Sequence, residues 1–91
     1  MRIKVVYRKN LKMTTGKVAA QVAHAVKNLG ETPEDCSIVV LKVSDKKFDE
    51  HAESEEGYMV RDHGKTEVDP GTRTAFAWID SAPTNPEATN G

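Results

Sequence analysis

The first half of this chain alternates between extended and helical sequence, and this alternation constrains the fold more than any other feature. Residues 3–8 are rich in β-branched and aromatic side chains and predict a strand, whereas residues 16–29 place valines at helical spacing. Residues 37–43 read Ser-Ile-Val-Val-Leu-Lys-Val, an apolar run typical of a central strand covered on both faces. A connection of this length through a helix favours a right-handed parallel crossover. The pattern therefore predicts an α/β fold.

The second half of the chain completes a small sheet. Residues 46–56 are rich in Lys, Asp and Glu and predict a short polar helix, and residues 58–61 and 72–79 predict two further strands. Asp-Pro-Gly-Thr at 69–72 suits a type II turn, because Pro fixes the first central dihedral and Gly accepts the positive second one. We predict an α/β three-layer sandwich with a small mixed four-stranded sheet and flanking helices. It would be a single domain of residues 1–79, followed by a flexible tail of residues 80–91.

Three polar side chains recur along one side of the first predicted helix. Lys17, Gln21 and His24 lie three or four residues apart, so they share a stripe beside the valine face. Thr14 or Thr15 can cap the helix before this stripe, and Gly30 can end it. On spacing alone, the stripe is either the solvent-facing side of an amphipathic helix or one wall of a site.

A second polar segment, residues 60–74, runs from the end of the third predicted strand into the start of the fourth. Together the two segments resemble the type 2 peptidyl-tRNA hydrolase family, whose first block reads Asp-Leu-Lys-Met, Gly-Lys, Ala-Ala-Gln and Ala-His-Ala. The matching residues here are Asn-Leu-Lys-Met at 10–13, Gly-Lys at 16–17, Ala-Ala-Gln at 19–21 and Ala-His-Ala at 23–25. The family's second block, Asp-Ala-Gly, Thr, Gly-Thr and Thr, is matched by Asp-His-Gly at 62–64, Thr66, Gly-Thr at 71–72 and Thr74. The resemblance covers most of residues 1–79.

The resemblance implies an enzyme that cleaves the ester between a peptide and the 3′ end of tRNA, so that the tRNA is recycled. It implies neither a metal nor a cofactor. Hydrolysis of this ester requires an activated water and a stabilised oxyanion; Asp62 can accept a proton and Lys17 can supply positive charge. Without the resemblance, Asp62 would be interpreted as a turn residue and Lys17 as a solvated helix lysine. The family's catalytic positions carry over as Lys17, Gln21, Asp62, Thr66 and Thr74, with His24, His63 and Thr72 as supporting residues.

Charge is distributed unevenly along the chain. Residues 1–30 carry seven Lys and Arg and no acidic residue, whereas residues 31–91 carry six basic and fourteen acidic residues. A positive region at the turn from strand to helix can neutralise phosphates, although the same asymmetry can serve solubility alone. The candidate tRNA-binding residues are Arg8, Lys9, Lys12 and Lys17.

Several departures separate the chain from the family pattern. Asn10 stands where Asp is common, and His63 stands where Ala is usual, so that its imidazole either tunes Asp62 or obstructs the pocket. Residues 79–83 read Ile-Asp-Ser-Ala-Pro where the family tends to show Gly-Pro and then a closing helix. We interpret the chain as a compact member lacking that C-terminal helix. Its absence would leave one side of the sheet for a partner or for a second copy in a homodimer.

The same departures keep a second functional class open, a non-catalytic relative that binds tRNA, a ribosome or a protein. A metal site is not expected, because Cys36 and the three histidines lack the spacing of a ligand pair. No apolar run is long enough to span a membrane and no signal-peptide pattern opens the sequence, so we expect a cytoplasmic protein.

Overall fold

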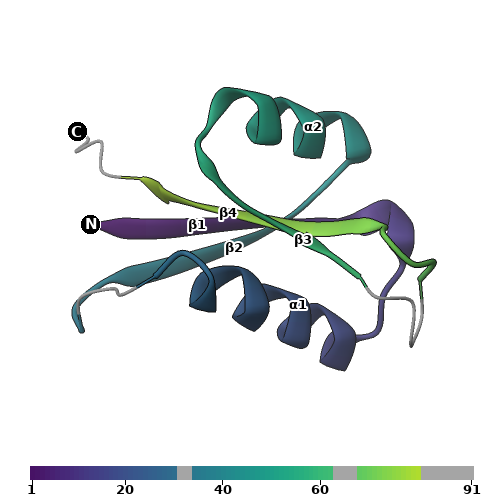
Figure 1. The fold of residues 1–91 in the computed structure, drawn as a ribbon, viewed down its shortest axis with the longest axis horizontal. Coiled ribbons are helices and arrows are strands. Elements are labelled where there is room, and N and C mark those ends of the chain that lie inside the picture. The colour runs from purple at the N-terminus through teal and green to yellow at the C-terminus, as the bar shows by residue number, and fades with distance from the viewer. Residues whose placement is uncertain (31–33, 63–67, 81–91) are drawn as a thin grey trace.

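The computed structural model describes residues 1–30, 34–62 and 68–80, and it confirms the predicted α/β sandwich (Figure 1). The elements along the chain are β1 (Arg2–Arg8), the 3-10 turn η1 (Lys9–Leu11), α1 (Thr15–Lys27), β2 (Ser37–Val43), α2 (Asp45–Ser54), β3 (Gly57–Arg61) and β4 (Arg73–Asp80). The strands form one four-stranded sheet in the order β2-β1-β4-β3. β1 runs parallel to β2, and β4 runs antiparallel to both β1 and β3. α1 and α2 lie on opposite faces of this sheet, which gives the three layers (Figure 1).

Local sequence signals account for the ends of both helices. The Thr14 side chain accepts a hydrogen bond from the Lys17 backbone N–H, and Ser44 caps α2 in the same way through the N–H of Lys47. At the other end of α1 the prediction was less accurate, because the helix ends with Asn28 as its cap, two residues before Gly30. Gly30 does adopt a positive φ of 106°, in the loop that follows the helix.

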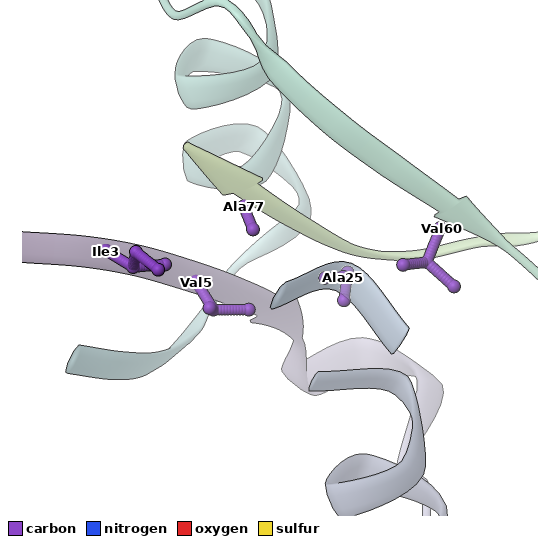
Figure 2. Packing of buried hydrophobic residues seen from close by; sticks show 6 residues of the cluster. Ile3, Val5, Ala25, Val60 and Ala77 are labelled. Carbon is purple, nitrogen blue, oxygen red and sulfur yellow. The ribbon is translucent and has the colours of Figure 1, made fainter. Parts of the chain in front are cut away.

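The hydrophobic core has one part on each side of the sheet. Beneath α1, Ala25 packs with Ile3 and Val5 of β1, Val60 of β3 and Ala77 of β4 (Figure 2). Beneath α2, Phe48 of that helix packs with Val6 of β1 and with Phe76 and Trp78 of β4, whose side chains alternate with those of the first cluster along the same strands. The sheet therefore uses both of its faces, as the period-2 alternation of strand side chains requires.

Two glycines have a clear structural reason. A Cβ on Gly57, at the start of β3, would lie 2.0 Å from the carbonyl oxygen of Ala77, so the two backbones could not keep their spacing. Gly71 has a φ of 82°, and the Thr72 N–H donates to the Asp69 carbonyl at 3.2 Å, which confirms the predicted turn at 69–72.

One prediction about the sheet was wrong. We expected residues 37–43 to form a central strand covered on both faces, but β2 is an edge strand, and Ile38 and Val40 are 53% and 44% exposed. A run of apolar residues indicates which side chains would favour burial, but it does not set the order of strands. Here β4 occupies the other side of β1, and α1 packs on β1, β3 and β4.

Some of the sequence-based predictions concern residues outside the described ranges. The predicted tail falls almost entirely on residues 81–91, and Thr66 and His63 fall on residues 63–67; all of these lie outside the described residues. Among the residues that the structure describes, no helix is both long and apolar enough to cross a membrane.

Candidate active site

A buried ion pair joins the first turn of α1 to the end of β3. The Lys17 ammonium group contacts the Asp62 carboxylate directly, and the two side chains are only 10% and 5% exposed. Lys17 reaches this position because the Thr14 cap starts the helix immediately before it. Lys17 is therefore not a solvated helix lysine, and the solvent-facing interpretation of the polar stripe fails at this residue.

The backbone of Asp62 is held by the type II turn. Its N–H donates to the carbonyl of Thr72 at 2.9 Å, and its carbonyl accepts from the N–H of Gly71 at 2.7 Å. Arg61 adds a hydrogen bond of 3.3 Å from its guanidinium to the Gly71 carbonyl. These bonds fix the direction in which the Asp62 carboxylate leaves the strand, so the turn residues 69–72 position a charged group that they do not themselves carry.

A second polar pair lies one helical turn further along α1. The Thr74 hydroxyl is fully buried and donates to the Gln21 side-chain oxygen at 2.5 Å, with the Val60 carbonyl 3.4 Å away. The pairing of β3 with β4 shifts here by one residue: Val60 lies opposite Ala75 and Arg61 opposite Arg73. Thr74 is left without an opposite residue, and such a bulge re-aims a side chain. Both Thr74 and Ala75 consequently face α1.

This arrangement brings four of the five predicted catalytic residues to one wall of the protein. Lys17 and Gln21 come from α1, and Asp62 and Thr74 come from the ends of β3 and β4 that meet it. Because the Gln21 oxygen accepts from Thr74, its amide NH₂ remains a donor. The wall thus offers a carboxylate, an ammonium group and an amide donor, which is a set able to orient water and stabilise an oxyanion.

The predicted supporting residues are less closely connected. His24 is exposed, one turn beyond Gln21, and its ring stacks on Tyr58 with the centroids 6.2 Å apart. Thr72 contributes through its backbone, which bonds to Asp62 and Asp69. Thr66 and His63, outside the described residues, keep the status of predictions.

The predicted tRNA-binding residues divide into two groups. Lys9 and Lys12 are exposed in the connection from β1 to α1, and within the described residues neither forms an ion pair. Arg8 lies under α2, where it binds both carboxylate oxygens of Asp45 at 2.9 and 3.3 Å and the Arg73 carbonyl at 2.8 Å. Its guanidinium is therefore already occupied within the protein.

Sequence reasoning missed the ion pairs beneath α2. Besides Arg8 and Asp45, Arg73 binds Asp49 at 2.8 Å, and both guanidinium groups lie over the ring of Phe48. The hydrogen bond from Arg8, together with the charges of Arg8 and Arg73, holds the pKa of Asp45 below its usual value. The available signal was the spacing of Asp45, Phe48 and Asp49, which puts them on one helix face.

The four residues of the wall, Lys17, Gln21, Asp62 and Thr74, are distinct from the cavity on the α2 side of the sheet. No group of three or more His, Cys, Asp or Glu side chains in the described parts of the chain could hold a metal ion. A cavity of about 400 Å³ opens on the α2 side, and none of its lining residues belongs to the wall. That lining consists of Asp49, Ala52, Glu53, Met59, Arg61, Arg73 and Phe76.

The amino-acid sequence also matches a known protein family and several known proteins. The model of one protein family, described as peptidyl-tRNA hydrolase PTH2, matches residues 1–85. A peptidyl-tRNA hydrolase of Methanopyrus kandleri is 39% identical over 92 residues, covering 79% of this chain and 78% of the relative. Those of Haloquadratum walsbyi and Halobacterium salinarum are 37% and 34% identical over 93 residues, covering 85% of this chain and 83% of each relative.

Proposed function

This chain belongs to the peptidyl-tRNA hydrolase PTH2 family and is a hydrolase, and we propose that Lys17, Gln21, Asp62 and Thr74 form its active site. The substrate is a peptidyl-tRNA, and the reaction releases the tRNA for reuse. Thr66 belongs to the proposed catalytic set through the family resemblance, with His24, His63 and Thr72 as supporting residues.

The proposed reaction begins with a water molecule beside the Asp62 carboxylate. The carboxylate takes a proton as the water oxygen attacks the carbonyl carbon of the ester. The tetrahedral intermediate carries a negative oxygen, which the Lys17 ammonium and the Gln21 amide donors stabilise. When the intermediate collapses, the bond to the ribose oxygen breaks, and that oxygen receives the proton that Asp62 took from the water, which restores the carboxylate. The products are a free peptide and a deacylated tRNA.

The observation that carries this proposal is the burial of the Lys17–Asp62 pair at the surface end of the sheet. Withdrawing both charges from water costs free energy that a purely structural pair seldom repays. Perturbed and buried ionisable groups are concentrated at functional sites for this reason. Gln21 and Thr74, also buried, add a directed hydrogen bond next to the pair rather than apolar packing.

Recognition of the tRNA is assigned to the connection between β1 and α1. Lys9 and Lys12 are exposed there and are available to phosphates, and Lys17 lies at the end of the same connection. The Arg8 guanidinium is already paired with Asp45, which leaves Lys9 and Lys12 as the principal phosphate contacts. This division refines the set expected from sequence.

The test is release of deacylated tRNA from a labelled peptidyl-tRNA by the purified protein. Asp62→Asn and Lys17→Ala should each lower kcat/KM at least about tenfold, equivalent to roughly 1.4 kcal/mol of transition-state stabilisation. Asp49→Asn is the matched control, because it also removes a carboxylate that is paired with a cation, but on the other face of the sheet. Circular dichroism would establish that all variants are folded.

Two results would contradict the assignment. If the folded wild type binds tRNA but releases nothing, the chain is a non-catalytic, tRNA-binding relative. If Asp49→Asn loses as much activity as Asp62→Asn, the Lys17–Asp62 pair is not the reaction centre.

The finer cellular setting is also a proposal. A protein that recycles tRNA would act in translation and in the cytoplasm. Association as a homodimer is supported by the exposed apolar side chains of β2.

A further inference from the structure

His24 and Tyr58 form an exposed aromatic pair beside the active-site wall. Their rings are inclined by only 21°, with the centroids 6.2 Å apart, which fits offset stacking. His24 is exposed and Tyr58 is half-buried, so the pair presents ring surface to solvent. A second histidine–aromatic pair, His51 with Trp78, differs because Trp78 is only 4% exposed and belongs to the core under α2. Core packing accounts for that second pair but not for the exposed surface of the first.

The pair lies in line with the proposed reaction centre. α1 and β3 run in opposite directions (Figure 1), so successive turns of the helix meet successive parts of the strand. At the start of α1, Lys17 contacts Asp62, which follows β3, and near the end of the helix His24 contacts Tyr58, near the beginning of β3. His24 follows Lys17 by seven residues, which corresponds to about 10.5 Å along the helix axis.

The surface of α1 between Lys17 and His24 is low. Ala20 is exposed and lies three residues after Lys17 and four before His24, so it shares their side of the helix. Gln21, beside it, is only 8% exposed and points to Thr74. Short or buried side chains therefore form the surface that leads from the reaction centre to the rings.

The order of groups along α1 indicates which part of the substrate extends toward the rings. Peptidyl-tRNA is linear, with the ester between the tRNA and the peptide. Lys9 and Lys12, the proposed phosphate contacts, precede α1, whereas His24 lies on the other side of Lys17 along the helix. With phosphates at the two loop lysines and the ester at Lys17, the peptide is the part that continues toward His24.

We propose that His24 and Tyr58 form a binding subsite for the peptide part of the substrate, an inference that rests on the proposed function. An extended peptide advances about 3.3 Å per residue, so the third residue from the ester would lie beside the rings. Flat ring surface binds apolar side chains and peptide planes through buried area rather than through directed hydrogen bonds. Such a subsite accepts many peptide sequences, and its two residues act in binding rather than in the chemical step.

The dependence of kcat/KM on peptide length tests the proposal. The substrates are tRNAs esterified with acetylated chains of one to five leucines. For the wild type, kcat/KM should rise about fivefold up to the third or fourth residue and then level off. His24→Ala should hydrolyse the one-residue substrate within about twofold of the wild type but lose that rise, whereas His24→Phe, which keeps a flat ring, should retain it.

His51→Ala is the matched control, because it removes a histidine stacked on an aromatic ring on the other face of the sheet. It should show the length dependence of the wild type. Ala20→Phe tests the path along α1, since a bulky ring there should lower kcat/KM for chains of three or more residues and spare the one-residue substrate. Ala19→Phe, at an exposed position away from the polar stripe, should not discriminate by length.

Several results would overturn the peptide subsite. One is a wild type without length dependence, and another is a His24→Ala variant that keeps it. An equal loss for His24→Ala at every length also overturns the proposal, and weaker binding of deacylated tRNA by that variant would then assign the rings to the tRNA. Asp62→Asn in the same series separates the two proposals. If Asp62→Asn is as active as the wild type, the catalytic assignment fails; if it is inactive while His24→Ala behaves as the wild type, only the subsite fails.

Discussion

The two faces of the sheet use ion pairs in contrasting ways. Under α1, Lys17 and Asp62 bury their charges almost completely. Under α2, the pairs of Arg8 with Asp45 and of Arg73 with Asp49 are partly open to solvent, with the two carboxylate side chains 46% and 49% exposed. Both arrangements link a helix to the ends of strands, so they would look equivalent in a simple count of salt bridges.

Solvent exposure separates their roles. The exposed pairs cost little to form and contribute little, and they add to packing around Phe48. The buried pair costs free energy both to form and to break, and such a cost is expected where the reaction needs the charges. The comparison teaches that burial of a pair, rather than its presence, indicates the functional face.

Breaking the buried pair should give the largest effect on stability. Lys17→Met removes the ammonium that contacts the Asp62 carboxylate, and we expect it to lower the free energy of unfolding by about 3 kcal/mol. The double variant Lys17→Met/Asp62→Leu should recover much of this loss, because neither charge is then buried, while kcat/KM stays at least about tenfold below that of the wild type. Urea unfolding of both variants measures the difference.

Asp49→Asn tests whether the exposed pair under α2 contributes less stability than the buried pair under α1. It should change the free energy of unfolding by less than about 1 kcal/mol. Equal losses for Asp49→Asn and Lys17→Met would mean that burial does not distinguish the two faces.

The bulge at Thr74 should give the next largest effect. Thr74→Val removes the hydroxyl that donates to Gln21, which leaves a buried amide oxygen without that donor and should cost about 1–2 kcal/mol of stability. The amide should also lose its orientation, so we expect kcat to fall more than KM rises. Thr74→Ser keeps the hydroxyl and should retain most of the activity. Steady-state kinetics measures both variants, and a Ser variant as impaired as the Val variant would show that the hydroxyl and its hydrogen bond are not sufficient for activity.

The sequence predicted the elements well where the signals are local. The Thr14 cap lies next to the helix that it begins, and Pro70 with Gly71 defines the turn that holds Asp62. The contact between Lys17 and Asp62 could be expected only because the family resemblance links the two motifs that contain them. The two residues are 45 positions apart, so no helical or strand periodicity relates them.

Other features depended on tertiary arrangement. Alternation along β4 would not assign Thr74 and Ala75 to the same face; the bulge does so. The edge position of β2 follows from how β4 pairs with β1, which the apolar run at residues 37–43 cannot encode. Arg8 was assigned to tRNA from charge alone, but the structure pairs its guanidinium with Asp45.

Lys12 extends the comparison to the loop beside the active site. It adopts a left-handed φ of 55°, a conformation that costs an ordinary side chain about 1 kcal/mol. Lys12→Gly should therefore raise the unfolding free energy by up to about 1 kcal/mol, while Lys12→Ala, which keeps a Cβ, should not. Both should weaken tRNA binding and reduce the slope of log K against log salt by about one phosphate contact. Binding isotherms at several salt concentrations measure this, and an unchanged slope would remove Lys12 from the tRNA surface.

The smallest effect is expected at Asp45, and it depends on pH. The hydrogen bond and charge of Arg8 lower the pKa of Asp45 from 3.8, so its carboxylate stabilises the folded state above that pH and the contribution disappears as pH falls through the lowered folded value. Asp45→Asn should therefore unfold slightly more easily than the wild type at pH 7, with the difference shrinking below about pH 4. Thermal unfolding of both proteins across this pH range measures the difference in stability. The kcat/KM of Asp45→Asn at pH 7 should stay within about twofold of the wild type, because the Arg8–Asp45 pair lies on the face of the sheet opposite Asp62. A large loss of activity in Asp45→Asn would show instead that the two faces are coupled through Arg8, since its guanidinium also binds the Arg73 carbonyl immediately before Thr74.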